Sequence, residues 1–206
     1  MSPECACRFG AVLDAETLPK TCKVVPEDLY QAVEVQNRET WDLIYRRWDQ
    51  TSDLYLKSYA KFYTNEKWET HFRALKPTRL VKEFLERRCA IVPWEKAIGV
   101  HIRRGDNKKS IEGSPLENFL QKMRENQEAF YVIATDDTKV KQQIVNEFGD
   151  RCVFPAITLS RKTEEGMIHG VADFFALTKC TELWGSYWSS FSEMASVYGN
   201  IALTIV

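Results

Sequence analysis

The 206-residue chain has 28 lysine and arginine residues against 29 aspartate and glutamate residues, a formal net charge of -1 at pH 7, and 44% hydrophobic residues. This balance supplies no overall basic field that would attract nucleic acid or an anionic membrane, so any anion site has to be local. The length suits one domain or two small ones, and no apolar run approaches the ~18 residues that a membrane span needs.

The beginning of the chain does not resemble a secretory signal. Its first twenty residues include acidic side chains and contain no long apolar stretch. We therefore expect a soluble, cytoplasmic protein, or a protein of the secretory pathway if a targeting segment has been removed.

Six cysteines lie at positions 5, 7, 22, 89, 152 and 180. Their spacing matches no zinc-binding pattern. Cys89, Cys152 and Cys180 lie in apolar surroundings at the ends of expected elements, which predicts buried free thiols. The first three cysteines could pair in an oxidising compartment, and the sequence leaves that open.

Residues 1–76 are expected to form a reduced, mainly helical N-terminal region. The segments 28–48 and 52–63 are rich in tryptophan and tyrosine and have weak strand signals, so we predict helical or mixed structure there. Pro77 then begins an amphipathic helix. We place a domain boundary at this point, with 77–206 as the second domain, and expect the helix to be the first element packed on its sheet.

Strand and helix patterns alternate from residue 97 onward. Short apolar runs predict strands at 97–102, 130–134, 152–154, 183–184 and 201–206. Helical spacing predicts helices after Ser114, from Asp137 to Gly149, over 171–178 and from Ser190 to Gly199. This alternation predicts an α/β fold, a Rossmann-like parallel sheet with helices on both faces. Ligands of such sheets bind outside the carboxyl ends of the strands.

Two of the expected helices begin with a capping-box pattern, a serine followed three residues later by a glutamate. In the first, Ser114 would cap the helix, with Pro115 at its first position and Glu117 completing the box. In the second, Ser190 and Glu193 would play the same parts.

A histidine and two arginines follow the strand at 97–102. His101 and Arg103 alternate with apolar residues and so lie on one side of the strand. Arg103, Arg104 and Asp106 come where the strand ends, and the planar fork of an arginine suits phosphate oxygens. The residues predict either a pyrophosphate clamp, with the aspartate orienting one arginine, or a solvated surface pair.

Two adjacent carboxylates, Asp136 and Asp137, follow the next strand. One of them is expected to cap the helix that comes after it. The other could accept hydrogen bonds from the amine of a nucleobase. A metal site is the weaker interpretation, because adjacent side chains diverge and no third carboxylate is near in the sequence.

A serine-rich segment joins the strand at 183–184 to the following helix. Helix N-termini offer free N–H groups to phosphate, and Ser189, Ser190 and Ser192 add hydroxyl donors, although one serine is expected only to cap the helix. The P-loop, dinucleotide and serine-nucleophile patterns are all absent. His71 is expected to be structural or exposed, and His169 to be a surface residue.

Three strings occur in order along the second domain: HIRRGD at 101–106, FYVIATDD at 130–137 and ADFFALTKCTELWGSYWSSFSEMAS at 172–196. They resemble the three motifs of the fucosyltransferase superfamily, the inverting α1,2-, α1,6- and protein O-fucosyltransferases. The resemblance covers roughly 77–206. It implies a GT-B fold, whose C-terminal Rossmann-like half holds GDP-fucose.

The resemblance also implies a donor site built from all three motifs. Its arginines would hold the β-phosphate, its serines would bond the diphosphate, and its histidine and aspartates would contact or order the nucleoside. The implied donor-binding residues are His101, Arg103, Arg104, Asp136, Asp137, Asp173, Ser189, Ser190 and Ser192.

The reaction implied is inverting transfer of fucose from GDP-fucose to a glycan or protein hydroxyl, with no metal and no cofactor. Arg103 and Arg104 would stabilise the charge on the leaving GDP in place of a metal ion. Asp106, and more weakly Glu112, are the candidates for the base that takes the proton of the acceptor hydroxyl.

The N-terminal region departs from the family pattern. Gly10 is the only glycine in residues 1–96, so the glycine-rich loop of the family's N-terminal domain has no counterpart. This leaves an alternative function: a catalytically silent GDP-sugar-binding module, or one part of a split transferase whose partner domain supplies the missing half. A third alternative is an unrelated α/β phosphate-binding protein.

Overall fold

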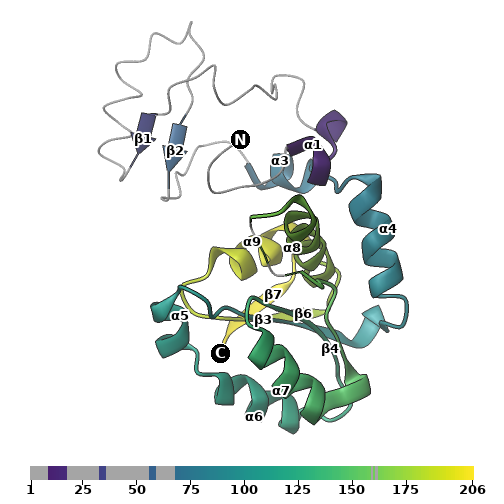
Figure 1. The fold of residues 1–206 in the computed structure, drawn as a ribbon, viewed down its shortest axis with the longest axis vertical. Coiled ribbons are helices and arrows are strands. Elements are labelled where there is room, and N and C mark those ends of the chain that lie inside the picture. Colours follow the sequence, from purple (N-terminus) through teal and green to yellow (C-terminus); the bar gives the residue numbers. More distant parts are fainter. Residues whose placement is uncertain (1–8, 18–32, 36–55, 59–67, 159, 161) are drawn as a thin grey trace, which may run out of the picture.

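A five-stranded parallel sheet forms the centre of the molecule (Figure 1). The computed structural model describes residues 9–17, 33–35, 56–58, 68–158, 160 and 162–206. The strands are β3 (Ala97–Ile102), β4 (Phe130–Thr135), β5 (Cys152–Val153), β6 (Glu182–Gly185) and β7 (Ala202–Ile205). They lie in the order β5-β4-β3-β6-β7, and every neighbouring pair is parallel. The predicted α/β fold with a parallel sheet is confirmed.

Helices cover both faces of this sheet. Helices α6 (Leu116–Glu125) and α7 (Thr138–Phe148) lie below it in Figure 1. Helices α8 (Glu164–Leu177) and α9 (Ser190–Gly199) lie above it, and α4 (Arg79–Arg88) packs beside α8. All six residues of β3 are buried, because the strand is central and has helices on either side.

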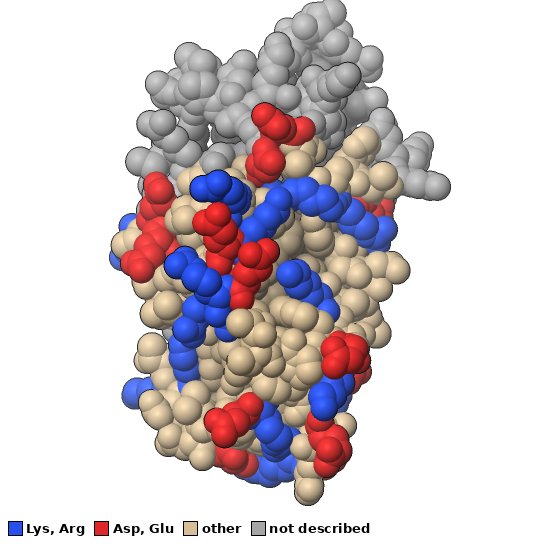
Figure 2. Space-filling view, turned by 90° about the vertical axis from the view of Figure 1, so that its right-hand side faces the viewer, with Lys and Arg blue, Asp and Glu red and all other residues tan. Residues whose placement is uncertain are grey.

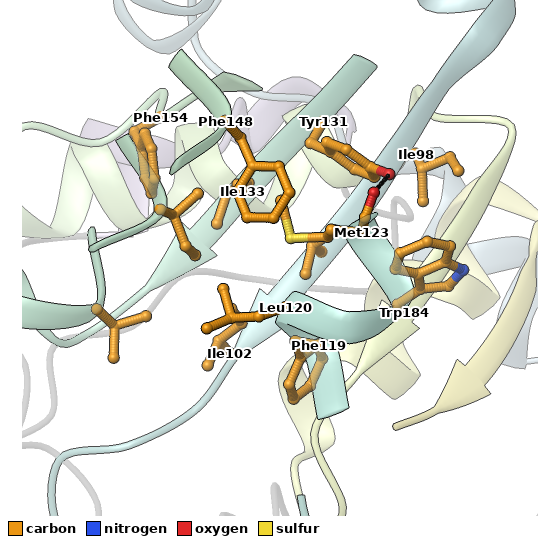
Figure 3. Packing of buried hydrophobic residues seen from close by; sticks show 13 residues of the cluster. Ile98, Ile102, Phe119, Leu120, Met123, Tyr131, Ile133, Phe148, Phe154 and Trp184 are labelled. Carbon is orange, nitrogen blue, oxygen red and sulfur yellow. Dashed lines mark hydrogen bonds between the residues drawn. The ribbon is translucent and has the colours of Figure 1, made fainter. Parts of the chain in front are cut away.

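The core between the sheet and α6 is filled by large side chains (Figure 3). Phe119, Tyr131 and Trp184 are almost completely buried. The Tyr131 hydroxyl donates to the carbonyl oxygen of Met123 at 3.0 Å, so its polar end is satisfied within the core. A core packed in this way fixes the position of β3, whose carboxyl end carries the predicted anion site.

Both predicted capping boxes are wrong. The Ser114 hydroxyl accepts a hydrogen bond from the backbone N–H of Tyr187 at 2.7 Å, and Pro115 is the residue that precedes α6. Helix α9 is preceded by Ser189, so Ser190 is its first helical residue. Because its hydroxyl binds Tyr187, Ser114 does not cap α6. The local sequence pattern could not show this contact with a distant residue.

The sequence analysis did not anticipate the short helix α5 (Lys108–Gly113), and it foresaw only the second half of α8. Asn107 caps α5 by accepting a hydrogen bond from the backbone N–H of Ser110 at 3.1 Å. Two short 3-10 helices, η3 (Trp94–Lys96) and η4 (Gly149–Arg151), adjoin the sheet.

The N-terminal region is described in pieces: α1 (Phe9–Val12), η1 (Ala15–Thr17), β1 (Val33–Val35), β2 (Leu56–Ser58) and α3 (Trp68–Ala74). Strands β1 and β2 pair in parallel, so the described parts of 28–48 and 52–63 are strands and not helices. The rest of both segments lies outside the described residues. The boundary between 1–76 and 77–206 stays a prediction.

Three cysteines belong to the described residues, and all three are free. Cys89 and Cys180 are buried, as predicted, and burial raises the pKa of Cys89 to about 11. Cys152 is only partly buried. The cysteines at 5, 7 and 22 lie outside the described residues. No helix in the described part of the chain is both long enough and apolar enough to cross a bilayer.

Candidate functional site

A cavity of about 740 Å³ opens at the carboxyl ends of the strands. Its volume falls within the range of ~300–1,000 Å³ that is typical of small-molecule sites. The polar side chains that line it are His101, Arg103, Asn107, Thr135, Asp136, Thr158, Ser160, Asp173, Ser189 and Ser190. The sheet order reverses between β3 and β6, and this is the point at which ligands bind in open α/β sheets.

Arg103 lies at this reversal, directly after β3. Its guanidinium is ion-paired through Nη1 with Asp136 and through Nη2 with Asp106. Its backbone N–H donates to the Ser186 hydroxyl at 3.0 Å, which ties the end of β3 to the end of β6. The two ion pairs engage two of the five N–H donors, so the side chain is oriented and keeps donors for an anion.

Arg104 takes a different position from Arg103, and the structure does not bring its guanidinium into the cavity. The side chain is buried, and Nη1 donates to the carbonyl oxygen of Arg103 at 3.0 Å, while Nη2 has no hydrogen-bond partner among the described residues. Burial lowers its pKa, and the nearby Asp136 and Asp137 oppose that effect. The expected clamp of two arginines is therefore reduced to Arg103 in the cavity.

Asp136 holds this arrangement together. Besides pairing with Arg103, it accepts a hydrogen bond from the backbone N–H of Arg104 at 2.7 Å. Gly105 has a φ of +40°, and a Cβ built there would lie 2.7 Å from Asp136 Oδ2. The glycine is therefore required by its backbone conformation and by the close approach of the carboxylate.

We expect the Gly105→Ala substitution to impair both folding and anion binding. The left-handed conformation costs an alanine about 1–2 kcal/mol, and the new methyl group displaces Asp136 from Arg103. Thermal unfolding and titration with GDP measure the two effects. Gly149→Ala is the matched control, because Gly149 has a φ of +47° and a Cβ added there would meet nothing within 4 Å. Equal GDP affinity in the two variants would contradict the role given to Asp136.

His101 lies in the wall of the cavity as a neutral imidazole. Its ring centroid is 4.8 Å from that of Phe191, and burial lowers its pKa to about 3. Its Nδ1 is buried and has no hydrogen-bond partner among the described residues. A neutral ring in this position suits a hydrogen bond to a nucleoside better than a contact with phosphate charge.

Asp173 orders the segment that follows β5. Its Oδ1 accepts a hydrogen bond from the backbone N–H of Ala156 at 2.8 Å. Lys141 Nζ donates to the carbonyl oxygen of Ala156 at 3.2 Å. Burial raises the pKa of Asp173 to about 7, against the opposing effects of that N–H and of Lys141. The residue also lines the cavity, so it can act both as support and as ligand.

The surface position predicted for His169 is wrong. The residue is buried, its ring stacks on Phe84 at 4.3 Å, and its Nδ1 accepts a hydrogen bond from the backbone N–H of Thr158 at 2.9 Å. Helix α8 starts earlier than expected, which places this histidine within the helix and against α4. His71 is exposed on α3.

Several predicted site residues lie outside the cavity lining. Asp137 caps α7 by accepting a hydrogen bond from the backbone N–H of Lys139 at 2.7 Å, as expected for one of the two carboxylates. Ser192 is buried in α9 against Gly185, and Glu112 is exposed on α5. Asp106 is highly exposed beside Arg103. The described residues contain no group of three or more side chains able to hold a metal ion.

The six predicted residues that the structure does bring together in the cavity are His101, Arg103, Asp136, Asp173, Ser189 and Ser190. The sequence analysis missed Trp188 and Asn107, although both lie within or beside the strings that it singled out. It also missed the apolar wall, which includes Phe72, Phe174, Phe191, Met194 and Tyr198. No local pattern marks that wall, because α3, α8 and α9 contribute to it from distant parts of the chain.

Positive and negative side chains are interspersed on the face seen in Figure 2, where no broad area of one sign appears. Among the described residues that line the cavity, Arg103 is the one lysine or arginine, and it lies at the end of the sheet. Its effect is strengthened by the N-terminus of α9, which lies across the reversal point with Ser189 and Ser190.

No protein-family model matches the sequence, and no curated protein matches it. Among solved structures, NodZ α-1,6-fucosyltransferase co-crystallised with GDP is similar, with 14% identity and a TM-score of 0.58 over 91% of this chain and 74% of that chain. This likeness shows that the chain has a fucosyltransferase-like fold.

Two further structures have lower scores. POFUT1 in complex with GDP-fucose has 10% identity and a TM-score of 0.49 over 82% of this chain and 58% of that chain. A mutant of Arabidopsis thaliana FUT1 in complex with GDP has 14% identity and a TM-score of 0.46 over 68% of this chain and 36% of that chain. The chain thus spans from about one third to three fifths of the length of these two proteins.

Proposed function

We propose that this chain binds GDP-fucose and transfers fucose to an acceptor hydroxyl. The observation that carries the proposal is the position of Arg103, oriented by two carboxylates at the reversal point of the sheet and facing the start of α9. An arginine fork opposite a helix N-terminus suits a diphosphate. The fucosyltransferase-like fold and the order of the three sequence motifs support fucose as the sugar.

The strand order suggests how the donor would lie. The segment after β5, held by Asp173, is three strands away from the loop after β6, a separation of roughly 14 Å at about 4.8 Å per strand. The nucleobase would occupy the end near Asp173, and the diphosphate would reach Arg103. His101, two residues before Arg103 in β3, would contact the part of the nucleoside next to the diphosphate. Ser189 and Ser190 would then contact phosphate oxygens from the other side.

The proposed transfer inverts the anomeric carbon. The acceptor oxygen forms a bond to that carbon as the bond to the GDP oxygen breaks, and GDP leaves with the bonding electron pair. Arg103 stabilises the negative charge that develops on the leaving diphosphate, so that no metal ion or cofactor is required. Asp106 is the proposed base that takes the acceptor proton, since it lies beside Arg103 and is 79% exposed. Neither carboxylate lines the cavity, and Glu112 is the weaker candidate because Asp106 is paired with Arg103 whereas Glu112 is exposed farther along on α5.

A second candidate is a GDP-sugar-binding module without turnover, or one part of a split transferase. It is favoured by the lack of a glycine-rich loop in residues 1–96, where Gly10 is the only glycine. In that case a partner domain would supply the missing half of the acceptor site.

Calorimetric titration with GDP, GDP-fucose, ADP and UDP tests the proposal. We expect the two guanine nucleotides to bind more tightly than ADP and UDP, and fucose transfer to survive a chelator. Tight GDP binding without any release of fucose from GDP-fucose would support the second candidate, a GDP-sugar-binding module without turnover. Failure of every nucleotide to bind would contradict both candidates.

A further inference from the structure

An exposed tryptophan, Trp188, stands at the mouth of the cavity. Its side chain lines the cavity and is 60% exposed, and the neighbouring Tyr187 is 47% exposed. The Nζ atom of Lys109 lies 4.1 Å from the centroid of the indole ring, a cation–π contact that steadies the ring. Large rings exposed together beside a cavity are typical of a binding surface rather than of a core.

The backbone at Trp188 has an unusual conformation. Its φ is +55°, in the left-handed region that bulky residues rarely adopt. Hydrogen bonds from α5 and its N-cap hold the segment in place: Asn107 Nδ2 donates to the carbonyl oxygen of Trp188 at 3.1 Å, and the Ser110 hydroxyl donates to that of Tyr187 at 2.7 Å. A glycine or asparagine would adopt this conformation with less strain, so the presence of a tryptophan here points to a use for its ring.

Trp188 belongs to the transfer end of the cavity. It immediately precedes Ser189, and its carbonyl is bound by Asn107, the residue after Asp106. It follows β6, whereas the segment ordered by Asp173 follows β5 on the far side of β4 and β3. A ligand that contacts this ring is therefore the group that approaches the donor sugar, and not the nucleobase.

We infer that Trp188 is the platform on which an acceptor sugar stacks, so that the acceptor is a glycan and not a protein hydroxyl; this inference rests on the proposed function. The C–H face of a pyranose is flat and apolar and matches an indole ring. Lys109 lies against the ring and Asn107 binds the carbonyl oxygen of the same residue, so polar groups suited to sugar hydroxyls are close to Trp188.

A peptide acceptor fits this surface less well. Extended peptides bind by pairing with free backbone groups of a sheet edge or by filling an apolar groove. In the loop at Trp188 three backbone groups are already used: the Tyr187 N–H donates to Ser114, and the carbonyls of both aromatic residues accept hydrogen bonds from Ser110 and Asn107.

The test uses the whole chain saturated with GDP. Saturation-transfer NMR would measure binding of oligosaccharides ending in glucose, galactose, mannose or N-acetylglucosamine, and of a serine-containing peptide. We expect at least one oligosaccharide to bind, Trp188→Asn to abolish the signal and Trp188→Tyr to retain it in part. The matched control is Trp94→Phe, since Trp94 also lies beneath a lysine (Lys179 Nζ at 5.3 Å from the ring centroid) but outside the cavity lining, and should keep full binding.

Two further measurements separate the possible failures. GDP affinity, measured on the same samples, should fall much less than oligosaccharide binding in Trp188→Asn. The melting temperature of this variant should be no lower than that of the original chain because asparagine tolerates the left-handed conformation. GDP binding with no oligosaccharide binding, or with oligosaccharide binding that survives in Trp188→Asn, overturns the inference alone. Peptide binding that is lost in this variant overturns the choice of a glycan. Absence of GDP binding overturns the proposed function, and the acceptor role with it.

Discussion

Replacing Arg103 by alanine should lower kcat/KM for fucose transfer by about 10²–10³-fold, the effect of removing one donor that stabilises a developing negative charge. Arg103→Lys should restore only part of the loss, since an ammonium group lacks the fork that pairs with Asp136 and Asp106 while facing a phosphate. Steady-state kinetics and GDP titration would measure the change. The loss should appear in both, because the side chain contacts the leaving group before and during transfer.

The matched control for Arg103 is Arg124→Ala. Arg124 is also paired with two carboxylates, Glu117 and Glu147, but it lies on the exposed side of α6 and outside the cavity lining. Surface ion pairs contribute about 0–1 kcal/mol, so this variant should fold and bind GDP normally. Near-normal fucose transfer by Arg103→Ala would contradict the proposal that Arg103 binds the diphosphate.

The second large effect is expected from Asp173→Asn, and it depends on pH. The folded chain raises the pKa of this carboxyl from 3.8 to about 7 through burial. Between those values the folded state holds a proton that the unfolded state has lost, so the stability of the original chain falls as pH rises. Over roughly three pH units, at about 1.36 kcal/mol per unit, the cost approaches about 4 kcal/mol. Above pH 7 the cost no longer grows.

Asparagine has no proton to lose and can still accept the hydrogen bond from the N–H of Ala156. The difference in unfolding free energy between Asp173→Asn and the original chain should therefore shift in favour of the variant from pH 4 to pH 7 and then level off. Denaturant unfolding at several pH values measures it, and the other titrating groups cancel in the comparison. A constant difference would show that the pKa of Asp173 is the same in the folded and unfolded chain, and so would contradict the predicted effect of burial.

The fold was largely predictable from local pattern. The strand at 97–102 coincides with β3, and the strands at 130–134 and 152–154 agree with β4 and β5 to within one residue. Central strands of a parallel sheet are buried on both faces and therefore appear as short apolar runs between turns. The N-terminal strands β1 and β2 have the sequences VEV and LKS, each with a charged residue at its centre, so they present no apolar run.

The site was predictable in its location and less so in its members. The order of the motifs placed polar groups at the ends of β3, β4 and β6, and parallel strands bring such ends to one edge. The sequence could not show which of Arg103 and Arg104 enters the cavity, because the two residues are adjacent and only the fold sets the direction of each side chain. One lines the cavity, and the other is buried outside its lining.

The amino-acid sequence alone was enough to predict an α/β protein with a parallel sheet, and an arginine, an aspartate and serines at the carboxyl ends of its strands. These features follow from periodicity and chain order, which are local properties. Three features became visible in the folded chain: Asp137 is the carboxylate that serves as a cap, His169 is buried, and Trp188 lies at the mouth of the cavity. Those outcomes depend on which groups from distant elements compete for the same hydrogen bonds and space, and no window of neighbouring residues contains that information.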